Sequence, residues 1–410
     1  MTQAPTTPAE IVTTESQLSS ALEHIARSRT VAIDLESNGF HRYPERICLL
    51  QIAVPDGIYI VDPLTVAAMA PLGAVLADAS VEKVFHSADY DIRSLDREWG
   101  FRVANLFDTG IAAAFTGSER LGLGSILEEH LQVSVPKEKK LQRSDWTLRP
   151  LNQESLEYAA SDVRHLIDLR EALGRKLAEL QRLEWAEEEF VRMTRVRYTR
   201  PDPETDFLNM KGALGMDGRQ LAVLKSLVEF REREARRMDR AYFRVIPDSA
   251  LIELAMDPAA DLAKVLGLGR YAHHPQANGL VKALQAGVNG PVFRRPAPTR
   301  PRWPRVTSAE RDIIEDRLRA LKGWRTDHSK AFKMDPALVW PAVSLERLAH
   351  EPDTLQAELA APEVRRWQVK VFGASLEKKL AVMAAEPEGR GDGHAADGEQ
   401  GDAPEGAAPA

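Results

Sequence analysis

The chain has 410 residues, of which 44% are hydrophobic and 28% charged, a composition typical of soluble proteins with about two to four domains. The single cysteine, Cys48, excludes an internal disulfide, and no apolar run approaches the ~18 residues that a membrane-spanning helix needs. The net charge of −7 does not exclude nucleic acid, because the segment from Glu386 onward holds seven acids and one base.

The N-terminus has no basic segment followed by an apolar one, so we expect no signal peptide and a cytoplasmic, reducing environment. Cys48 lies in an apolar, strand-like run, which favours a buried structural thiol over a nucleophile. The sequence indicates no membrane association and no protein partner.

Strand-like and helix-like segments alternate in the first half of the chain. We expect residues 1–10 to be disordered and residues 11–195 to form one α/β domain with a mixed sheet flanked by helices. A helix is predicted to begin at residues 14–17, and a long helical stretch to run from Glu154 to about Thr194. Strands are predicted at 31–36, 47–54, 57–61 and 83–85.

The second half of the chain is predicted to be helical. After a linker at 196–211, we expect two all-α domains at 212–290 and 306–383, joined by an Arg/Pro-rich linker at 291–305. The tail at 384–410 is acidic and rich in Gly, Ala and Pro, and is predicted to be disordered.

The two helical domains resemble each other in sequence. Phe230-Arg231 and Trp324-Arg325 are 94 residues apart, and Leu254-Ala255 and Leu348-Ala349 have the same separation. Met238-Asp239 and Met334-Asp335 are 96 apart, which implies one small insertion that is later compensated. We interpret this spacing as an internal repeat, with chance similarity among helix-rich sequences as the alternative.

Two acids stand out in the first predicted strand. Asp34 and Glu36 are two residues apart, so their side chains point to the same face of the strand, among core residues. A strand interior does not accommodate two carboxylates without a partner, and a divalent cation would be such a partner. A surface loop with two ordinary acids is the alternative.

Further acids follow in predicted helices. Asp91 falls in the first helical turn after a strand, with Asp89 as the competing choice. Tyr158 and Asp162 are four residues apart and share one helix face. Taken alone, each is a pattern common on helix surfaces.

Together, Asp34, Glu36, Asp91 and Asp162 could surround one point. Two like charges 4 Å apart repel by about 4 kcal/mol at an effective dielectric near 20, so four carboxylates would cluster only around cations. Oxygen-only ligands select hard ions, so we expect two Mg²⁺ or Mn²⁺ ions. Such a pair can promote phosphodiester hydrolysis, with Tyr158 orienting the attacking water.

Three motifs resemble those of the DEDDy exonucleases, the ribonuclease H-like group that includes ribonuclease D, Rrp6 and the Werner-type exonuclease. They are Asp34-Leu-Glu36, residues 85–92 and Tyr158-Ala-Ala-Ser-Asp162. Matching to the second motif selects Asp91, and the tyrosine places the chain in the tyrosine subclass. The resemblance implies a metal-dependent 3′–5′ exoribonuclease that trims RNA with a free 3′ end, such as precursor tRNA and other small stable RNAs, to nucleoside 5′-monophosphates.

The helical repeats resemble HRDC domains, and one exonuclease domain followed by two HRDC domains is the arrangement of bacterial ribonuclease D. The resemblance covers roughly residues 8–375. It implies a ribonuclease H-like α/β domain followed by two all-α HRDC domains, which are usually auxiliary nucleic-acid binders.

Several basic and aromatic residues are candidates for RNA contacts. Trp146 and Arg149 lie in a stretch that resembles ribonuclease D and Rrp6, with a packed tryptophan and a turn at Pro150 as the alternative. The remaining candidates form a patch before the third motif, a predicted helical stripe and part of the Arg/Pro-rich linker: Lys139, Lys140, Arg237, Arg240, Arg244, Arg302 and Trp303. A solvated helix face and a soluble spacer are the alternatives for the last two groups.

Two other functions fit the same motifs. A 3′–5′ exonuclease acting on DNA would carry the same acids, because the contacts that recognise the 2′-OH lie outside them. A catalytically silent RNA-binding scaffold is the other alternative, although all five motif positions carry competent residues.

Overall fold

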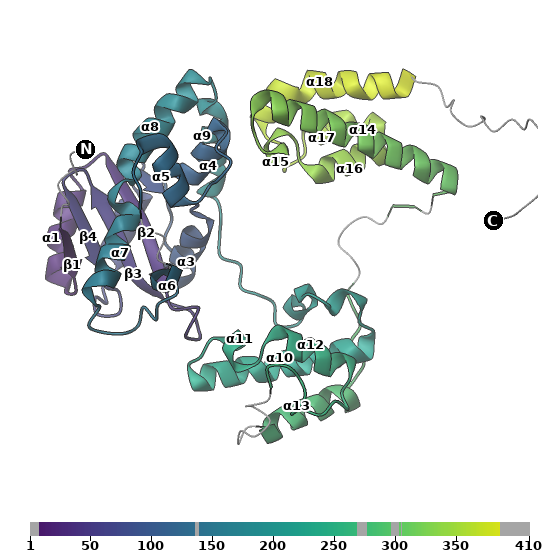
Figure 1. Cartoon of the computed structure of the whole chain (residues 1–410), viewed down its shortest axis with the longest axis horizontal. Helices are drawn as coiled ribbons and strands as arrows, with labels where there is room; N and C mark the ends of the chain where they lie inside the picture. Colours follow the sequence, from purple (N-terminus) through teal and green to yellow (C-terminus); the bar gives the residue numbers. More distant parts are fainter. Residues whose placement is uncertain (1–7, 136–138, 269–276, 297–302, 305, 386–410) are drawn as a thin grey trace, which may run out of the picture. The chain divides into compact units, whose positions relative to one another are not determined.

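A six-stranded mixed sheet lies at the centre of the N-terminal domain, in the order β1-β4-β3-β2-β5-β6 (Figure 1). The strands are β1 (Ala9–Val12), β2 (Thr30–Ser37), β3 (Ile47–Val54), β4 (Gly57–Val61), β5 (Glu82–Phe85) and β6 (Leu106–Asp108). β2 pairs antiparallel with β3 and parallel with β5, so the predicted mixed sheet is present. All eight residues of β3 are buried, which explains why its sequence is an almost uninterrupted apolar run.

The computed structural model describes residues 8–135, 139–268, 277–296, 303–304 and 306–385. Within these ranges, no helix is long and apolar enough to cross a membrane. The chain divides into one unit up to Pro304 and a second from Arg305 onward.

Helices pack on both faces of the sheet, and α7 crosses β4, β3 and β2 (Figure 1). The helices of this domain are α1 (Glu15–Ile25), α2 (Ala70–Ala77), α3 (Asp89–Trp99), α4 (Thr109–Thr116), α5 (Leu123–Leu131), α6 (Lys139–Gln142), α7 (Gln153–Arg164), α8 (Leu166–Glu179) and α9 (Leu183–Met193). The helix predicted at 14–17 begins there, because Thr14 and Gln17 form a reciprocal capping box. The stretch from Glu154 to Thr194 contains three helices, with breaks at His165 and at Gln181, whose φ is 56°.

The start of the domain differs from the prediction. β1 begins at Ala9 and pairs in parallel with β4, so residues 9 and 10 belong to the sheet and are not disordered. β1 is an edge strand of only four residues, with Glu10 and Ile11 exposed, and is too short to give a recognisable strand pattern. Residues 1–7 lie outside the described ranges.

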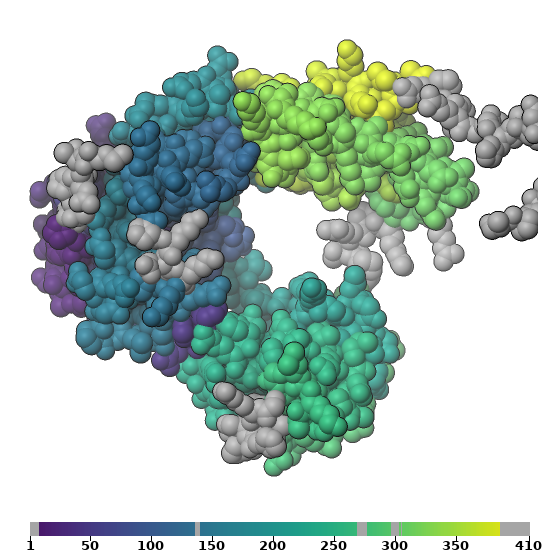
Figure 2. Space-filling model, in the orientation of Figure 1, coloured from purple at the N-terminus to yellow at the C-terminus, as the bar shows by residue number. Residues whose placement is uncertain are grey.

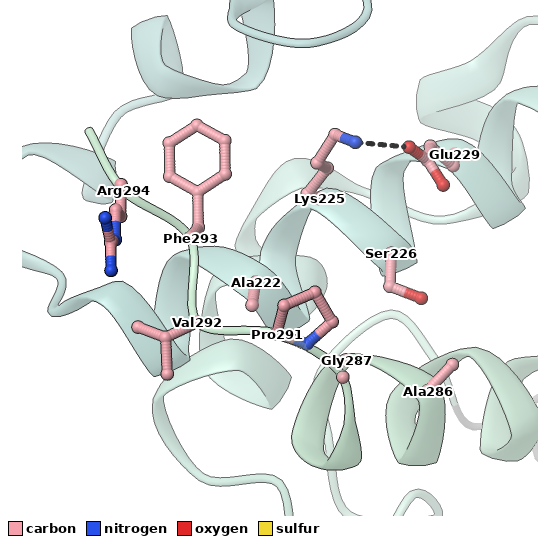
Figure 3. A pocket seen from close by; sticks show the side chains of 11 residues that line it. Ala222, Lys225, Ser226, Glu229, Ala286, Gly287, Pro291, Val292, Phe293 and Arg294 are labelled. Carbon is pink, nitrogen blue, oxygen red and sulfur yellow. Dashed lines mark ion pairs between the residues drawn. The ribbon is translucent and has the colours of Figure 1, made fainter. Parts of the chain in front are cut away.

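A helical domain follows, with a core that includes Phe207, Phe230 and Leu254. Its elements are the 3₁₀ helices η1 (Asp206–Asn209) and η2 (Ala213–Gly215), and the α-helices α10 (Gly218–Met238), α11 (Tyr242–Val245), α12 (Asp248–Met256) and α13 (Ala277–Asn289). The predicted linkers at 196–211 and 291–305 are both too long, because η1 and residues 291–294 belong to this domain. Residues 291–294 line a cavity of about 360 Å³ beside α10 and α13 (Figure 3), and the Phe293 ring lies 5.0 Å from that of Phe207.

In the C-terminal unit, α14, α15 and α16 repeat the order of α10, α11 and α12, and the helices from α14 to α18 pack into one body (Figure 2). They are α14 (Ser308–Phe332), α15 (Pro336–Val339), α16 (Ala342–His350), η3 (Pro352–Thr354), α17 (Leu355–Leu359) and α18 (Arg366–Ala385). α18 runs two residues past the predicted boundary at 383. The rest of the predicted acidic tail, residues 386–410, lies outside the described ranges.

The predicted internal repeat is present, with a constant offset of 94 residues. α11 and α15 have this offset, and so have α12 and α16. The Arg231 guanidinium donates to the carbonyl oxygen of Ile246 at 3.0 Å, and Arg325 donates to that of Trp340 at 3.3 Å. The insertion implied by the two Met-Asp pairs is absent, because those pairs occupy different positions in the two copies.

Candidate active site

Three segments that are distant in sequence bring acids together. Asp34 and Glu36 project from β2, Asp91 lies in the first turn of α3, and Asp162 lies near the end of α7. One carboxylate oxygen from each of Asp34, Glu36 and Asp162 lies within 4.8 Å of the others. Asp91 is outside this group of three, but it is buried and raises the pKa of Glu36 by electrostatic repulsion.

A cavity of about 470 Å³ opens beside these acids. Its walls include Asp34, Glu36 and Asp162, together with Tyr158 and His86. Residues 122–125, at the start of α5, form another part of the wall. The acids therefore face a space that a nucleotide could enter.

Burial raises the pKa values of all four carboxyl groups, and repulsion between the acids adds to this for Glu36, Asp91 and Asp162. Burial raises the pKa of Asp34 to about 7, against a hydrogen bond from the backbone of Leu35 that lowers it. Burial, followed by the charge of Asp34, raises the pKa of Asp162 to about 8. The pKa values of Glu36 and Asp91 also lie well above their usual range, mainly because of burial.

These groups fit a divalent cation. Without one, the four carboxyl groups cannot all be ionised near neutral pH, whereas a hard dication accepts such a set of oxygen ligands. Gln51 gives a second indication that a polar group or ion binds here. It pairs with Asp34 across β2 and β3, so its side chain points to the same face of the sheet. Its amide is fully buried and has no hydrogen-bond partner among the described residues.

The tyrosine of the third motif lies beside the acids. Burial, and then the charges of Asp162, Glu36 and Asp34, raise the pKa of Tyr158 far above its usual value. The ring lies 6.1 Å from that of Trp146, which is 1% exposed. The phenol is therefore neutral at physiological pH and can orient a water molecule, but it is not suited to remove a proton.

Asp108 is a site residue that the sequence analysis missed. It is fully buried, and its two oxygens accept hydrogen bonds from the backbone N–H groups of Ser87, Ala88 and Gly110 at 2.8–3.0 Å. Ser87 has a left-handed φ of 60°, and a Cβ on Gly110 would lie 2.6 Å from the Ser87 hydroxyl. This tight packing fixes the turn from which α3 carries Asp91 into the site.

A local pattern could have identified Asp108. Its sequence Asp-Thr-Gly follows an apolar strand and precedes a helix, which is typical of an N-cap aspartate. The side chain does cap α4, accepting from Gly110 and Ile111. Its additional bonds to the turn before α3 depend on the pairing of β5 with β6, which no local pattern shows.

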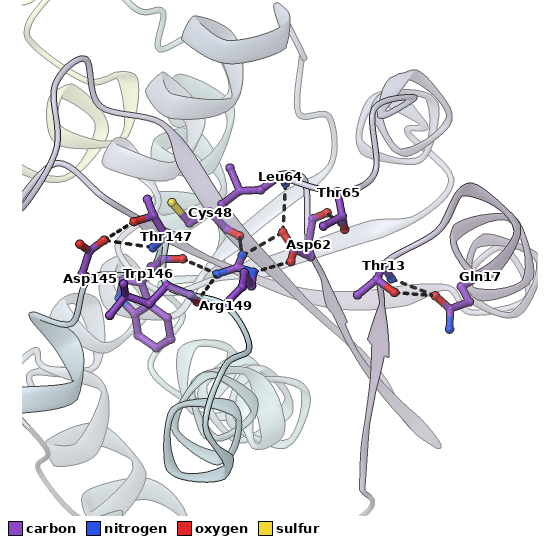
Figure 4. A network of polar contacts seen from close by, with 11 residues as sticks. Thr13, Gln17, Cys48, Asp62, Leu64, Thr65, Asp145, Trp146, Thr147 and Arg149 are labelled. Carbon is purple, nitrogen blue, oxygen red and sulfur yellow. Dashed lines mark hydrogen bonds and ion pairs between the residues drawn. The ribbon is translucent and has the colours of Figure 1, made fainter. Parts of the chain in front are cut away.

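The guanidinium of Arg149 is bound by neighbouring protein groups, although the residue lies at the surface. Its guanidinium donates to both oxygens of Asp62 at 2.6 and 2.9 Å, and to the carbonyl oxygens of Cys48, Trp146 and Leu148 (Figure 4). These five bonds use all five N–H groups, so none remains for a phosphate. For Trp146 and Arg149, the geometry favours the alternative of a packed tryptophan and a structural turn.

The remaining predicted RNA-binding residues that the structure describes lie on several different elements. Lys140 and Arg240 are exposed, Trp303 is 36% exposed, and Arg237 pairs with Glu234 at 2.8 Å. The stripe predicted for Arg237, Arg240 and Arg244 does not form on one helix, because α10 ends at Met238 and Asp239 is left-handed, with a φ of 44°. Arg302 and the side chain of Lys139 lie outside the described residues.

Comparisons with known proteins define the class of the chain. The 3′–5′ exonuclease family matches residues 9–178, and the HRDC domain family matches residues 220–273. The crystal structure of Escherichia coli RNase D has the same fold, with a TM-score of 0.66 at 24% identity over 92% of this chain and 99% of that one. The chain thus has the predicted 3′–5′ exonuclease domain and first HRDC domain, followed by a helical C-terminal region.

More similar relatives identify the family. Ribonuclease D of Gluconacetobacter diazotrophicus is 31% identical over 88% of this chain and 90% of its own length. The catalytic core of Trypanosoma brucei RRP6 is 26% identical, with a TM-score of 0.59 over 70% of this chain and 81% of that one. The chain belongs to the ribonuclease D family and is a divalent-metal-dependent 3′–5′ exoribonuclease.

Proposed function

We propose that the chain removes nucleotides one at a time from RNA 3′ ends by two-metal-ion hydrolysis. The observation that carries this proposal is the convergence of Asp34, Glu36 and Asp162 within 4.8 Å beside the cavity, with buried Asp91 next to them. Two Mg²⁺ or Mn²⁺ ions held there would activate the attacking water and stabilise the leaving oxygen.

The roles of the residues follow from their positions. Asp34 is the candidate for contact with both ions, because its carboxylate lies near Glu36 and Asp162 and electrostatically affects Asp91. Glu36 and Asp162 would each contribute to one ion. The neutral phenol of Tyr158, which shares the cavity, would hold the water in line with the phosphorus atom.

The proposed products are nucleoside 5′-monophosphates, and the proposed substrates are precursor tRNA and other small stable RNAs in the cytoplasm. Escherichia coli RNase D, whose structure has the same fold, is an exoribonuclease involved in structured RNA processing. Structured RNAs with short single-stranded 3′ ends suit a cavity that is large enough for few nucleotides at once.

The test is a degradation assay resolved to single nucleotides. Matched single-stranded RNA and DNA are incubated with Mg²⁺, with Mn²⁺ or with EDTA, and the products are analysed for 5′-phosphate. We expect stepwise RNA shortening that EDTA abolishes. Internal cuts, 3′-phosphate products or faster hydrolysis of the DNA would contradict the proposal.

A further inference from the structure

The loop between β2 and β3 connects the exonuclease domain with the first helical domain. The backbone N–H of Ala241 donates to the carbonyl oxygen of His41 at 3.0 Å. The hydroxyl of Tyr43 donates to Glu232 on α10 at 2.6 Å, and its ring packs against the core of the helical domain. These contacts place the loop directly beside α10 and α11.

A third segment, the stretch after α6, contacts the same loop. Arg42 forms ion pairs with Asp145 at 3.0 Å and with Asp239 at 3.3 Å, so one side chain joins the two segments. Nε2 of His41 donates to the carbonyl oxygen of Arg143 at 2.7 Å. Three separate parts of the chain therefore meet around the tip of the loop, at Phe40.

Exposed rings and cations gather at this point. Phe40 and Phe243 are 40% and 37% exposed, and their ring centres lie 5.6 Å apart. The guanidinium groups of Arg244 and Arg143 lie over the Phe40 ring, at 4.5 and 5.6 Å from its centre. We call Phe40, Arg143, Phe243 and Arg244 the aromatic–arginine cluster.

Within the described part of the chain, neither arginine of the cluster forms an ion pair with an acid. Among the residues that the structure describes, no carboxylate lies within 4.0 Å of the guanidinium nitrogens of Arg143 or Arg244. In contrast, Arg42, Arg231 and Arg237, on the loop and α10, all form ion pairs with acids. Exposed aromatic rings beside unpaired arginines are the combination that binds single-stranded nucleic acid, through base stacking and phosphate contacts.

We propose that the aromatic–arginine cluster is a subsite for the RNA strand that precedes the 3′-terminal nucleotide. A base stacks on the exposed ring of Phe243, while Arg143 and Arg244 contact the phosphates on either side. This proposal rests on the proposed function, because it assumes that the RNA 3′ end lies at the acidic site.

The chain limits the distance between the two sites. Phe40 follows Glu36 by four residues, so their Cα atoms are at most about 15 Å apart. Stacked nucleotides advance by about 3.4 Å each, so the last four or so nucleotides would span this distance. The subsite therefore affects an RNA that is long enough to reach it and has no effect on a dinucleotide.

The length of the substrate supplies the test. Steady-state hydrolysis of a dinucleotide is compared with that of an unstructured RNA of about ten nucleotides, which exceeds this estimated path. For Phe243→Leu and for Arg244→Gln, we expect the KM of the longer RNA to rise about tenfold, within the range of one lost stacking or phosphate contact. The kcat for both substrates and the KM of the dinucleotide should stay within about twofold of the wild-type values, because the acidic site is unchanged.

A matched control separates this subsite from general charge effects. Arg233→Gln removes the same charge from an exposed position on α10 outside the cluster, and should leave the KM of both RNAs unchanged. Thermal unfolding of each variant checks that the fold is retained. An unchanged KM for the longer RNA in both cluster variants, or an equal rise for the dinucleotide, would overturn the proposal.

Equilibrium binding makes the failure of the two proposals distinguishable. Fluorescence anisotropy of the same ten-nucleotide RNA is measured in EDTA, where no hydrolysis occurs. Weaker binding by Phe243→Leu supports the subsite even if the assay above contradicts the proposed hydrolysis. Equal binding by wild type, Phe243→Leu and Arg244→Gln would overturn the subsite alone.

Discussion

The exonuclease domain and the two helical repeats place their distinctive residues in opposite ways. In the exonuclease domain, the distinctive residues are buried charges such as Asp91 and Asp108, which an apolar core would otherwise exclude. In the repeats, the buried positions serve the fold in both copies: Leu254 and Leu348 are equivalent, and both are fully buried. Differences in function between the repeats must therefore lie on their surfaces.

The surfaces of the two repeats do differ at the aromatic–arginine cluster. With the offset of 94 residues, Phe243 and Arg244 of the first repeat correspond to Ala337 and Leu338 of the second. The second copy thus keeps the helical scaffold without the ring or the cation. The two copies therefore share a packing unit, and the proposed RNA contact of the first copy depends on residues that the second copy lacks.

The largest effect is expected from a buried acid of the exonuclease domain. Asp34→Asn should lower the rate of nucleotide release by about a thousandfold or more, because loss of several kcal/mol of metal-dependent stabilisation costs a factor of ten per 1.36 kcal/mol. RNA binding in EDTA should remain largely intact, since the aromatic–arginine cluster is unchanged. The measurement is single-turnover hydrolysis of a labelled RNA at saturating Mg²⁺ or Mn²⁺.

The neighbouring acid Asp89 provides the matched control for this experiment. It is exposed and pairs with Arg93 at 2.8 Å, so Asp89→Asn should retain nearly full activity. Metal-dependent trimming by Asp34→Asn at the wild-type rate would contradict the proposed mechanism. It would also show that a buried acid of the site matters no more for activity than an ordinary surface acid.

The next largest effect is expected from Asp108, which acts through the position of Asp91. In Asp108→Asn, the side-chain amide places an N–H group against the N–H of Ala88, where the carboxylate now accepts at 2.8 Å. The turn before α3 should shift, and we expect activity to fall about 10- to 100-fold, as for other residues that orient metal ligands. Titration with Mn²⁺ should show a higher metal concentration for half-maximal rate.

A purely structural role for Asp108 predicts a different result. In that case the variant would have a lower melting temperature, while the fraction that is folded would hydrolyse RNA with the wild-type metal dependence. The comparison is sharpest with Asp78→Asn, since Asp78 is an exposed acid whose side chain accepts local hydrogen bonds from Ser80. This control should leave both the melting temperature and the metal dependence nearly unchanged.

Much of the fold could be predicted from local patterns. The strand at Ile47–Val54 has an apolar sequence because both of its faces are covered, and the helix at Glu15 begins with a capping pair. The edge strand at Ala9 could not be predicted, because its pairing with β4 and not its own composition orders it. The packing of Phe293 against Phe207 could not be predicted either, because Phe293 lies in a proline-rich segment whose composition indicates a linker.

The site was predictable to the extent that its motifs are local. Asp34, Glu36 and Asp162 could be selected from their spacing, and the structure brings them together. Arg149 shows the limit of such reasoning, because its partner Asp62 is 87 residues away. The sequence identifies a positively charged side chain, but only the fold shows whether its N–H groups are free to bind RNA.

The buried acids also predict a dependence of stability on pH. In the metal-free protein, the pKa of Asp34 is raised from 3.8 to about 7 and that of Asp162 to about 8, so the folded state holds protons that the unfolded chain releases above pH ~4. Stability from these groups is therefore fully present below pH ~4 and is lost progressively as the pH rises to about 8. We expect Mn²⁺ to raise the melting temperature by a few degrees more at pH 8 than at pH 6.

Replacing Asp34 tests whether the buried acids cause this dependence of stability on pH. In Asp34→Asn, repulsion among the remaining acids is smaller, so the melting temperature in EDTA should fall less between pH 6 and pH 8 than in the wild type. Differential scanning calorimetry at the two pH values, with and without Mn²⁺, measures all four conditions. An equal Mn²⁺ effect at both pH values would show that protons and cations do not compete at these carboxylates.

The smallest effect is expected from the arginine that the two repeats share. Arg231 is 6% exposed, donates to Ile246 and Asp248, and lies 4.7 Å from the centre of the Tyr242 ring. Arg231→Met should destabilise the first helical domain by about 1.5–3 kcal/mol, the range for hydrogen bonds of charged groups. Hydrolysis of a dinucleotide should be unaffected, because the acidic site does not involve this residue.

Arg325 occupies the equivalent position and should matter less. Its guanidinium donates to Trp340 at 3.3 Å, and Ala342 stands where the first repeat has Asp248, so no equivalent ion pair can form. We expect Arg325→Met to cost about 1 kcal/mol, as for one ordinary hydrogen bond. Hydrogen exchange of peptides covering α12 and α16 measures both effects in the full chain. Equal losses of stability in the two repeats would show that the hydrogen bond from the arginine to the backbone carbonyl, and not the ion pair with Asp248, determines the contribution of this arginine to stability.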